Sequence, residues 1–199
     1  VDTGNGVYMM HGRPMKDHNW HRGGYGVINT TQILMYSSNI GVSRLVDENY
    51  HKNPEKFVEG LYKLGLATPL NLDIPGAAKK PNIRKPNKDN WSKTALAWMS
   101  IGYETQVPPM NTLAFYNAIA NNGKMVKPRF VKSIMKDGEV VEDIPVEVLN
   151  PAIASPKTIE QIQTIREKVV SEGLGKRAGS SQFHVSGKTG TAQVTQGKG

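Results

Sequence analysis

Apolar residues recur at helical spacing along much of this chain, and several of these runs carry their own start and stop signals. The clearest run begins at Asn53-Pro54-Glu55, a capping residue followed by proline and an acid, and Gly65 is its stop signal. Its apolar side chains stand three and four residues apart, which predicts a helix. The same reasoning predicts helices at residues 30–36, 40–50, 94–100, 110–121 and 156–173.

Alternating polar and apolar residues replace the helical pattern in two places. Residues 124–144 alternate around Lys136-Asp137-Gly138-Glu139, which predicts a hairpin. Residues 183–194 predict a final strand. Residues 1–26 and 67–90 show little periodicity, so we expect loops there, with short strands in the first. The pattern predicts a mostly helical protein with a few strands near its end.

Composition narrows the class of protein. The chain has 199 residues, enough for one domain with a sizeable core, and no stretch approaches the roughly 20 apolar residues of a membrane span. It has no cysteine, which excludes disulfides, thiol nucleophiles and cysteine-ligated metals. Because Val1 is not a methionine and the last residues follow the predicted strand directly, we expect a piece of a longer protein.

The charge is basic, at +8, and much of the excess lies between Lys79 and Lys93. Asparagines and prolines are interleaved with these charges, so a solvated loop is the favoured interpretation. The sequence contains no zinc-finger spacing, P-loop or aromatic-rich RNA-binding pattern, and we therefore expect no nucleic-acid partner.

Two short motifs carry candidate chemistry. Ser37-Ser38-Asn39 lies between two predicted helices, and Lys188-Thr189-Gly190-Thr191 lies on the predicted final strand. They resemble the second and third of the three motifs of penicillin-recognising serine acyl-transferases. A Ser-x-Asn alone is common and can simply be a helix-capping turn, whereas Lys-Thr-Gly-Thr occurs on the order of once in 10⁵ positions.

Each motif residue suits a step of acyl transfer to a peptide. The Ser37 hydroxyl can both donate and accept a proton, and the Asn39 amide can bind a substrate backbone. Lys188 supplies a fixed positive charge. A strand edge with a glycine, here Gly190, lets a substrate lie close. The Thr189 and Thr191 hydroxyls can hold a substrate carboxylate.

Longer stretches around these motifs resemble class B penicillin-binding proteins, and the resemblance spans about residues 2–194. Asp2-Thr3-Gly4, Asp17-His18-Asn19 and Gly24-Tyr25-Gly26 look closest to the division-specific members. The stretches that carry the family resemblance are residues 38–43, 101–104, 118–123 and 186–193.

The resemblance implies an α+β fold of the β-lactamase/transpeptidase type, of which this chain holds mostly the helical part, the motif-bearing strand and a hairpin. It implies a peptidoglycan D,D-transpeptidase in the parent protein, with catalytic roles for Ser37, Asn39 and Lys188. It also implies substrate binding by Thr189, Gly190 and Thr191, with the Thr191 N–H in the oxyanion hole. No metal or cofactor is implied.

The resemblance also implies partners and a location. The substrate would be the D-Ala-D-Ala stem peptide of peptidoglycan. β-Lactams would acylate the serine of the parent protein that attacks this peptide. The parent protein would sit in the cell inner membrane by a single-pass anchor, with this domain in the periplasm. Division or elongation membrane proteins would be its partners.

The nucleophile's Ser-x-x-Lys motif departs from the family pattern. In the family it precedes the Ser-x-Asn motif, but no such string lies before Ser37. Ser133-Ile134-Met135-Lys136 has the right letters, yet it comes later and on a predicted strand, whereas the nucleophile needs a helix start. We therefore expect residues 1–199 to be a partial transpeptidase domain without nucleophile or downstream strands, inactive alone.

Two other functions stay open from the sequence. A serine β-lactamase or penicillin-sensing domain shares these motifs, although Ser38 stands where many β-lactamases carry aspartate. A non-catalytic module could instead dock onto division or elongation partners through its helical surface, or onto anionic wall polymer through Lys79–Lys93.

Overall fold

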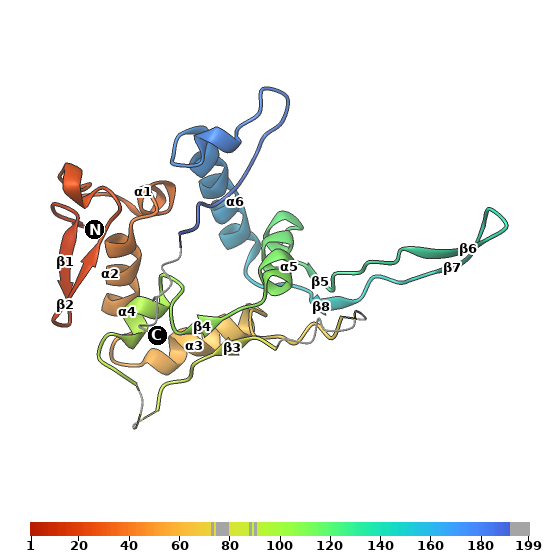
Figure 1. The fold of residues 1–199 in the computed structure, drawn as a ribbon, viewed down its shortest axis with the longest axis horizontal. Coiled ribbons are helices and arrows are strands. Elements are labelled where there is room, and N and C mark those ends of the chain that lie inside the picture. Colours follow the sequence, from red (N-terminus) through yellow and green to blue (C-terminus); the bar gives the residue numbers. More distant parts are fainter. Residues whose placement is uncertain (73, 75–79, 88, 90, 192–199) are drawn as a thin grey trace, which may run out of the picture. The chain divides into compact units, whose positions relative to one another are not determined.

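The structure is a computed structural model that describes residues 1–72, 74, 80–87, 89 and 91–191 (Figure 1). The chain divides into two compact units, one of residues 1–42 with 163–199 and one of residues 43–162. The helices are α1 (Thr30–Met35), α2 (Asn39–Tyr50), α3 (Pro54–Lys63), α4 (Ala95–Met99), α5 (Pro109–Ala120) and α6 (Pro156–Ser171). Each predicted helix is therefore confirmed to within about two residues at either end.

The first unit begins with a hairpin, in the region where the sequence predicted loops with short strands. Strand β1 (Val7–Met10) pairs antiparallel with β2 (Arg13–Lys16), and the short 3-10 turn η1 (Trp20–Arg22) follows. The turn between the strands, His11-Gly12, takes positive φ at both residues, the geometry of a tight hairpin turn. Met10 and Met15 point into the core of this unit and are buried.

Helix α1 carries a reciprocal cap. The Asn29 side chain accepts from the Gln32 N–H at 2.9 Å, and the Gln32 side chain accepts from the Asn29 N–H at 3.0 Å. At the far end, the Leu174 N–H donates to the Met35 carbonyl at 3.1 Å. A Cβ at Gly173 would stand 2.6 Å from that oxygen, so a glycine is required where the end of α6 meets α1.

The second unit is built from short strands around α3, α4 and α5. One core cluster joins α5 to Met125 and Ile159, and another joins Val58 of α3 to Ile83 and Met99. The paired strands are β3 (Asn82–Ile83) with β4 (Thr105–Gln106), β5 (Met125–Val126) with β8 (Val148–Asn150), and β6 (Ser133–Lys136) with β7 (Glu139–Asp143).

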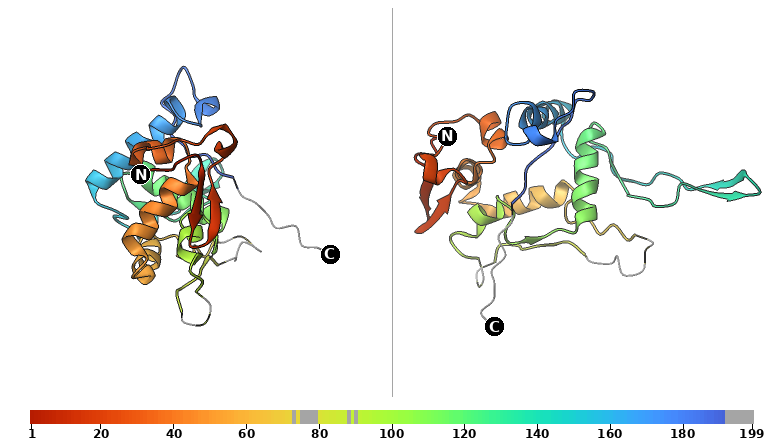
Figure 2. Two further views of the ribbon diagram at one scale, coloured as in Figure 1. Left: turned by 90° about the vertical axis from the view of Figure 1, so that its left-hand side faces the viewer. Right: turned by 45° about the horizontal axis from the view of Figure 1, so that its top comes forward.

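The predicted hairpin is confirmed as β6 and β7, which turn at Asp137-Gly138 with positive φ at both residues. It extends from β5 and β8 as a two-stranded ribbon, with most of its residues exposed (Figures 1 and 2). Ser133 lies on this ribbon. Because Ser133 and Lys136 are three residues apart on a strand, they point to opposite faces, and they do not form the one-turn helical pair that a nucleophile motif needs.

The predicted final strand is wrong for residues 183–191, and residues 192–194 lie outside the described part. Residues 184–191 are irregular. The physical reason is that a strand exists only as part of a ladder, and among the described residues no segment forms a ladder with them. A single backbone bond, from the Gly187 N–H to the Arg166 carbonyl at 3.2 Å, ties the segment to α6.

None of the helices in the described ranges is both long and apolar enough to cross a membrane.

Two glycines near the end of α3 should respond oppositely to alanine. Gly65 has φ +82°, and a Cβ there would stand 2.7 Å from Met125 Sδ. We expect Gly65→Ala to lower the free energy of unfolding by at least about 1–2 kcal/mol, the cost of a left-handed residue with a side chain. Gly60 lies inside α3 with nothing within 4 Å of an added Cβ, so Gly60→Ala should raise stability by about 0.5–1 kcal/mol.

Urea denaturation of the two variants beside the wild type measures both changes. Equal shifts in one direction would show that the turn after α3 is not formed as described.

Candidate functional site

The two predicted motifs meet in the first unit. Lys188 Nζ donates to Ser37 Oγ at 2.7 Å, although the two residues are 151 positions apart in the sequence. The same ammonium also reaches the Thr189 carbonyl at 3.0 Å and Thr189 Oγ1 at 3.3 Å. A lysine ammonium has three N–H donors, so these three acceptors can satisfy all of them. The amine is therefore held in one position against the Ser37 hydroxyl.

Burial of this amine changes its acidity. Lys188 is half-buried, and its desolvation lowers the pKa of the ammonium from the ordinary value of 10.5. A lysine that gives up its proton more readily is suited to exchange protons with a neighbouring hydroxyl. The geometry thus places the Lys188 ammonium and the Ser37 hydroxyl within proton-transfer distance of each other.

Ser37 occupies the tight turn between α1 and α2. Its backbone has φ +51°, the left-handed region that residues with a side chain seldom adopt. The end of α1 and the start of α2 lie so close in the sequence that the chain must turn at Ser37. The Ser37 N–H donates to the Leu34 carbonyl at the end of α1, and α2 begins two residues later at Asn39.

Asn39 and Ser38 are held by the end of strand β2. Asn39 Nδ2 donates to the Lys16 carbonyl at 3.0 Å. Ser38 Oγ donates to Asp17 Oδ2 at 2.7 Å and accepts from the Gly41 N–H at 2.9 Å, which makes Ser38 the cap of α2. The sequence interpretation of Ser37-Ser38-Asn39 as a capping turn is thus correct for Ser38, and it is compatible with the chemistry of its neighbours.

Two aromatic side chains border the turn. The rings of Tyr25 and Tyr36 stack with centroids 4.9 Å apart and planes at 16°. The Tyr25 hydroxyl lies 3.1 Å from His18 Nε2 and donates to the Tyr36 carbonyl at 3.4 Å. Burial, with the nearby Asp17 carboxylate as a second cause, raises the pKa of Tyr25 to about 12. This phenol therefore stays protonated and serves as a donor.

The substrate-binding residues predicted on the third motif, Lys188-Thr189-Gly190-Thr191, are more exposed to solvent. Gly190 and Thr191 are exposed, and an added Cβ at Gly190 would meet nothing within 4 Å. Thr189 is partly buried and contacts Lys188 through both its carbonyl and its hydroxyl. The structure thus brings Ser37, Lys188 and Thr189 together, with Asn39 two residues from Ser37.

Sequence reasoning missed the part that Asp17 plays. It used Asp17 only as one letter of a family resemblance. Asp17 lies 22 residues before the first residue of α2 in the sequence, so no local sequence signal connects it to that helix start.

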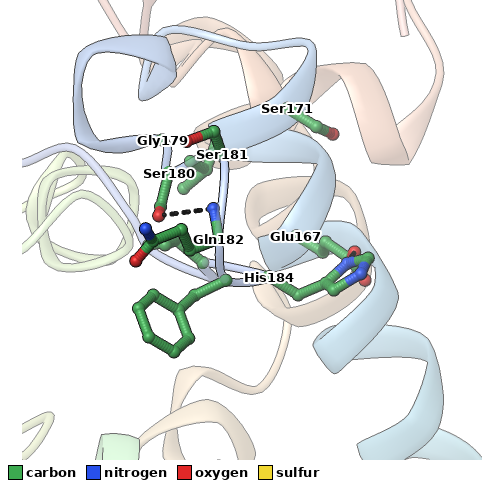
Figure 3. A pocket seen from close by; sticks show the side chains of 10 residues that line it. Glu167, Ser171, Gly179, Ser180, Ser181, Gln182 and His184 are labelled. Carbon is green, nitrogen blue, oxygen red and sulfur yellow. Dashed lines mark hydrogen bonds and ion pairs between the residues drawn. The ribbon is translucent and has the colours of Figure 1, made fainter.

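A separate hollow of about 260 Å³ lies beside the C-terminal half of α6 (Figure 3). Residues 179–185 form one wall, and Glu167, Val170 and Ser171 of α6 form the other. His184 Nδ1 lies 2.7 Å from Glu167 Oε1, and the Gln182 N–H donates to Ser180 Oγ at 3.1 Å. None of the predicted site residues lines this hollow, so it is separate from the predicted site.

The raised pKa of Tyr25 predicts a change in alkaline stability. Unfolded tyrosine loses its proton near pH 10 and folded Tyr25 near pH 12. Between these values the folded chain holds a proton that the unfolded chain has lost. The free energy of unfolding should therefore fall as pH rises from about 10 to about 12, and Tyr25→Phe should make that fall less steep.

Denaturation of wild type and Tyr25→Phe over this pH range tests the expectation, with Tyr8→Phe as the matched control on an exposed tyrosine. Identical slopes for the three proteins would contradict it.

Comparison with known proteins gives a consistent result. Residues 3–199 match the family described as the penicillin-binding protein transpeptidase domain. The chain is 32% identical to penicillin-binding protein PbpB of Mycolicibacterium smegmatis over 82% of its length and 25% of that protein's. It is also 32% identical to the probable peptidoglycan D,D-transpeptidase PbpC of Pseudomonas aeruginosa, over 87% of its length and 28% of that protein's. The chain thus spans little more than a quarter of these relatives.

Solved structures agree. The transpeptidase domain of penicillin-binding protein 3 from Burkholderia pseudomallei matches all of this chain and 55% of that one, with a TM-score of 0.78 and 28% identity. Penicillin-binding protein 3 of Mycobacterium tuberculosis gives the same score and identity over 97% of this chain and 43% of that one. The expected α+β transpeptidase-type fold is confirmed, and the β-lactamase and non-catalytic alternatives are not favoured.

Relatives of the division type are among the matches, including the peptidoglycan D,D-transpeptidase FtsI of Buchnera aphidicola, at 26% identity over 86% of this chain and 28% of that protein. The chain belongs to the penicillin-binding protein transpeptidase family, in its class B branch.

Proposed function

We propose that this chain forms part of a peptidoglycan D,D-transpeptidase, which cross-links stem peptides through a serine acyl-enzyme. The single observation that carries the proposal is the 2.7 Å hydrogen bond from Lys188 Nζ to Ser37 Oγ, which joins the second and third motifs of the family. A relative of the same family is named a probable peptidoglycan D,D-transpeptidase, which supports the assignment.

The pair would move a proton during acylation. When a nucleophilic serine attacks the carbonyl of the penultimate D-Ala, its hydroxyl proton must leave and the departing D-Ala amine must gain one. A hydroxyl that donates and accepts at once, such as that of Ser37, can pass this proton without carrying net charge. The Lys188 ammonium would hold that hydroxyl in line and stabilise the negative charge that develops nearby.

The remaining site residues would bind the stem peptide. The Asn39 amide, anchored through Nδ2 to the Lys16 carbonyl, would present its oxygen to a substrate N–H. Thr189 and Thr191 would hold the terminal carboxylate, and the open surface at Gly190 would admit the peptide backbone. The Thr191 N–H would complete the oxyanion hole.

The nucleophile would come from a part of the intact protein outside residues 1–199. Ser133 to Lys136 is the only Ser-x-x-Lys string in the chain, and it forms strand β6 rather than a helix start. The family relatives are roughly three times as long as this chain, which leaves ample sequence for the nucleophilic serine. Residues 1–199 would then be a partial transpeptidase domain.

The substrate would be the D-Ala-D-Ala end of a stem peptide, and β-lactams would acylate the same serine. Structures of the Mycobacterium tuberculosis penicillin-binding protein 3 with ampicillin and with aztreonam support the second point. The intact protein would be held in the inner membrane by a single-pass anchor, with this domain in the periplasm beside division or elongation membrane proteins.

Mutation of the proton-transfer pair should slow acylation of the intact protein by a fluorescent penicillin. Since general acid–base catalysis contributes about 10²- to 10⁴-fold, we expect Ser37→Ala and Lys188→Ala each to lower the acylation rate by factors in that range. Ser133→Ala is the matched control, a serine on an exposed ribbon, and it should label at the wild-type rate. Loss of labelling in Ser133→Ala would overturn the assignment of the nucleophile.

The isolated 199-residue chain should behave differently from the intact protein. It carries the proton-transfer pair but, on this proposal, no serine to be acylated. We expect no covalent label on the isolated chain under conditions that label the intact protein to one equivalent, as measured by mass spectrometry. Stoichiometric labelling of the chain would place the nucleophile within residues 1–199.

A further inference from the structure

The position of Ser37 depends on contacts on either side of it. A serine with φ +51° is in a conformation that its side chain disfavours, so neighbouring residues must hold it there. On the α1 side, Tyr36 is stacked on Tyr25. On the α2 side, Ser38 is bonded to Asp17. These two contacts lie on either side of Ser37, whose hydroxyl accepts from Lys188.

The contact at Asp17 is the better defined of the two. Both Asp17 and Ser38 are essentially inaccessible to solvent, at 0% and 1% exposure. Asp17 uses both carboxylate oxygens, because Oδ2 accepts from Ser38 Oγ at 2.7 Å and Oδ1 accepts from the Ile40 N–H at 3.0 Å. Ile40 lies in the first turn of α2, so the carboxylate also faces the positive end of this 12-residue helix.

Asp17 is itself fixed by its own backbone. Its N–H donates to the Gly6 carbonyl at 3.0 Å, and its carbonyl accepts from the Trp20 N–H at 3.1 Å. The preceding carbonyl, of Lys16, accepts from Asn39 Nδ2. The end of strand β2 therefore holds Ser38, Asn39 and Ile40 at once, and each of these bonds restricts the turn on which Ser37 sits.

We propose that Asp17 is a positioning residue for acyl transfer, which holds the Ser37 hydroxyl in line with Lys188 by clamping Ser38 and the first turn of α2. This inference rests on the transpeptidase function proposed above. Asp17 is buried away from solvent, and its carboxylate accepts hydrogen bonds from Ser38 and Ile40 rather than from Ser37 or Lys188, so it acts through its neighbours.

Asparagine is the informative substitution at this position because it keeps the shape of the side chain. Its single oxygen can accept from Ser38 Oγ or from the Ile40 N–H, but not from both in the present geometry. If the oxygen serves Ser38, the new NH₂ group faces the Ile40 N–H, and two donors oppose each other. The clamp is then released on one side without a cavity being made.

The test is the acylation of the intact protein by a fluorescent penicillin, followed in time at several penicillin concentrations. Because small misplacement of a catalytic group can cost up to about 10²-fold, we expect Asp17→Asn to slow the acylation step by about 10- to 100-fold. The apparent dissociation constant of the non-covalent complex and the final label per protein should stay as in the wild type.

A merely structural role gives a different result. Loss of a buried hydrogen bond that only stabilises the fold reduces the labelled fraction at the plateau and leaves the rate of the folded fraction unchanged. Asn111→Ala is the matched control for this outcome, because Asn111 is buried and its Nδ2 donates to the Thr68 carbonyl at 2.7 Å within the other unit. We expect it to affect the plateau but not the rate.

A double-mutant cycle shows whether Asp17 acts through Ser38. If it does, Ser38→Ala and Asp17→Asn combined should slow acylation by less than the product of the two single effects. A wild-type rate in Asp17→Asn, or a reduced plateau at an unchanged rate, overturns the role of Asp17. Absence of labelling in the wild-type intact protein overturns the transpeptidase function itself.

Discussion

The hydrogen bond between Lys188 and Ser37 is the interaction on which the candidate site depends, because it joins the two motifs. An ammonium loses hydration when it is half-buried, and that loss must be offset by acceptors close at hand. Lys188 has three of them, the Ser37 hydroxyl and two oxygens of Thr189. Two of the three come from the adjacent residue, so the contact with Ser37 is the one that requires the fold. It ties an irregular segment after α6 to the turn between α1 and α2.

That contact is made possible by close packing elsewhere in the same unit. Gly173 and Leu174 bring the chain after α6 against the Met35 carbonyl, two residues before Ser37. The Gly187 N–H then bonds to α6 one residue before Lys188. The segment that carries the third motif is therefore positioned by α6 and α1 rather than by a sheet. Lys188 therefore reaches Ser37 although its segment pairs with no strand among the described residues.

The helices could be predicted from the sequence because their causes are local. Apolar spacing, the Asn29 cap and Pro54 all act within a few residues, and the Asp137-Gly138 turn does the same for the hairpin. The strand at residues 183–191 failed because strand formation depends on a pairing partner, which alternation alone does not supply. Two-residue strands such as β3 and β4 are too short to show any period.

In the candidate site, too, some features could be predicted from the sequence and others depend on the fold. The types of its residues were predictable, since the chemistry of acyl transfer restricts them and the family resemblance gave their order. The support behind them was not, because a buried carboxylate such as Asp17 looks in the sequence like any solvated acid. What distinguishes it is burial at the start of α2, a property of the folded unit. Rigid support is concentrated behind Ser37, while Gly190 and Thr191 stay exposed on the side that would meet the peptide. A site arranged in this way would fix the Ser37 and Lys188 side chains before substrate arrives and leave the proposed substrate-binding surface accessible, which is what catalysis by preorganised groups requires.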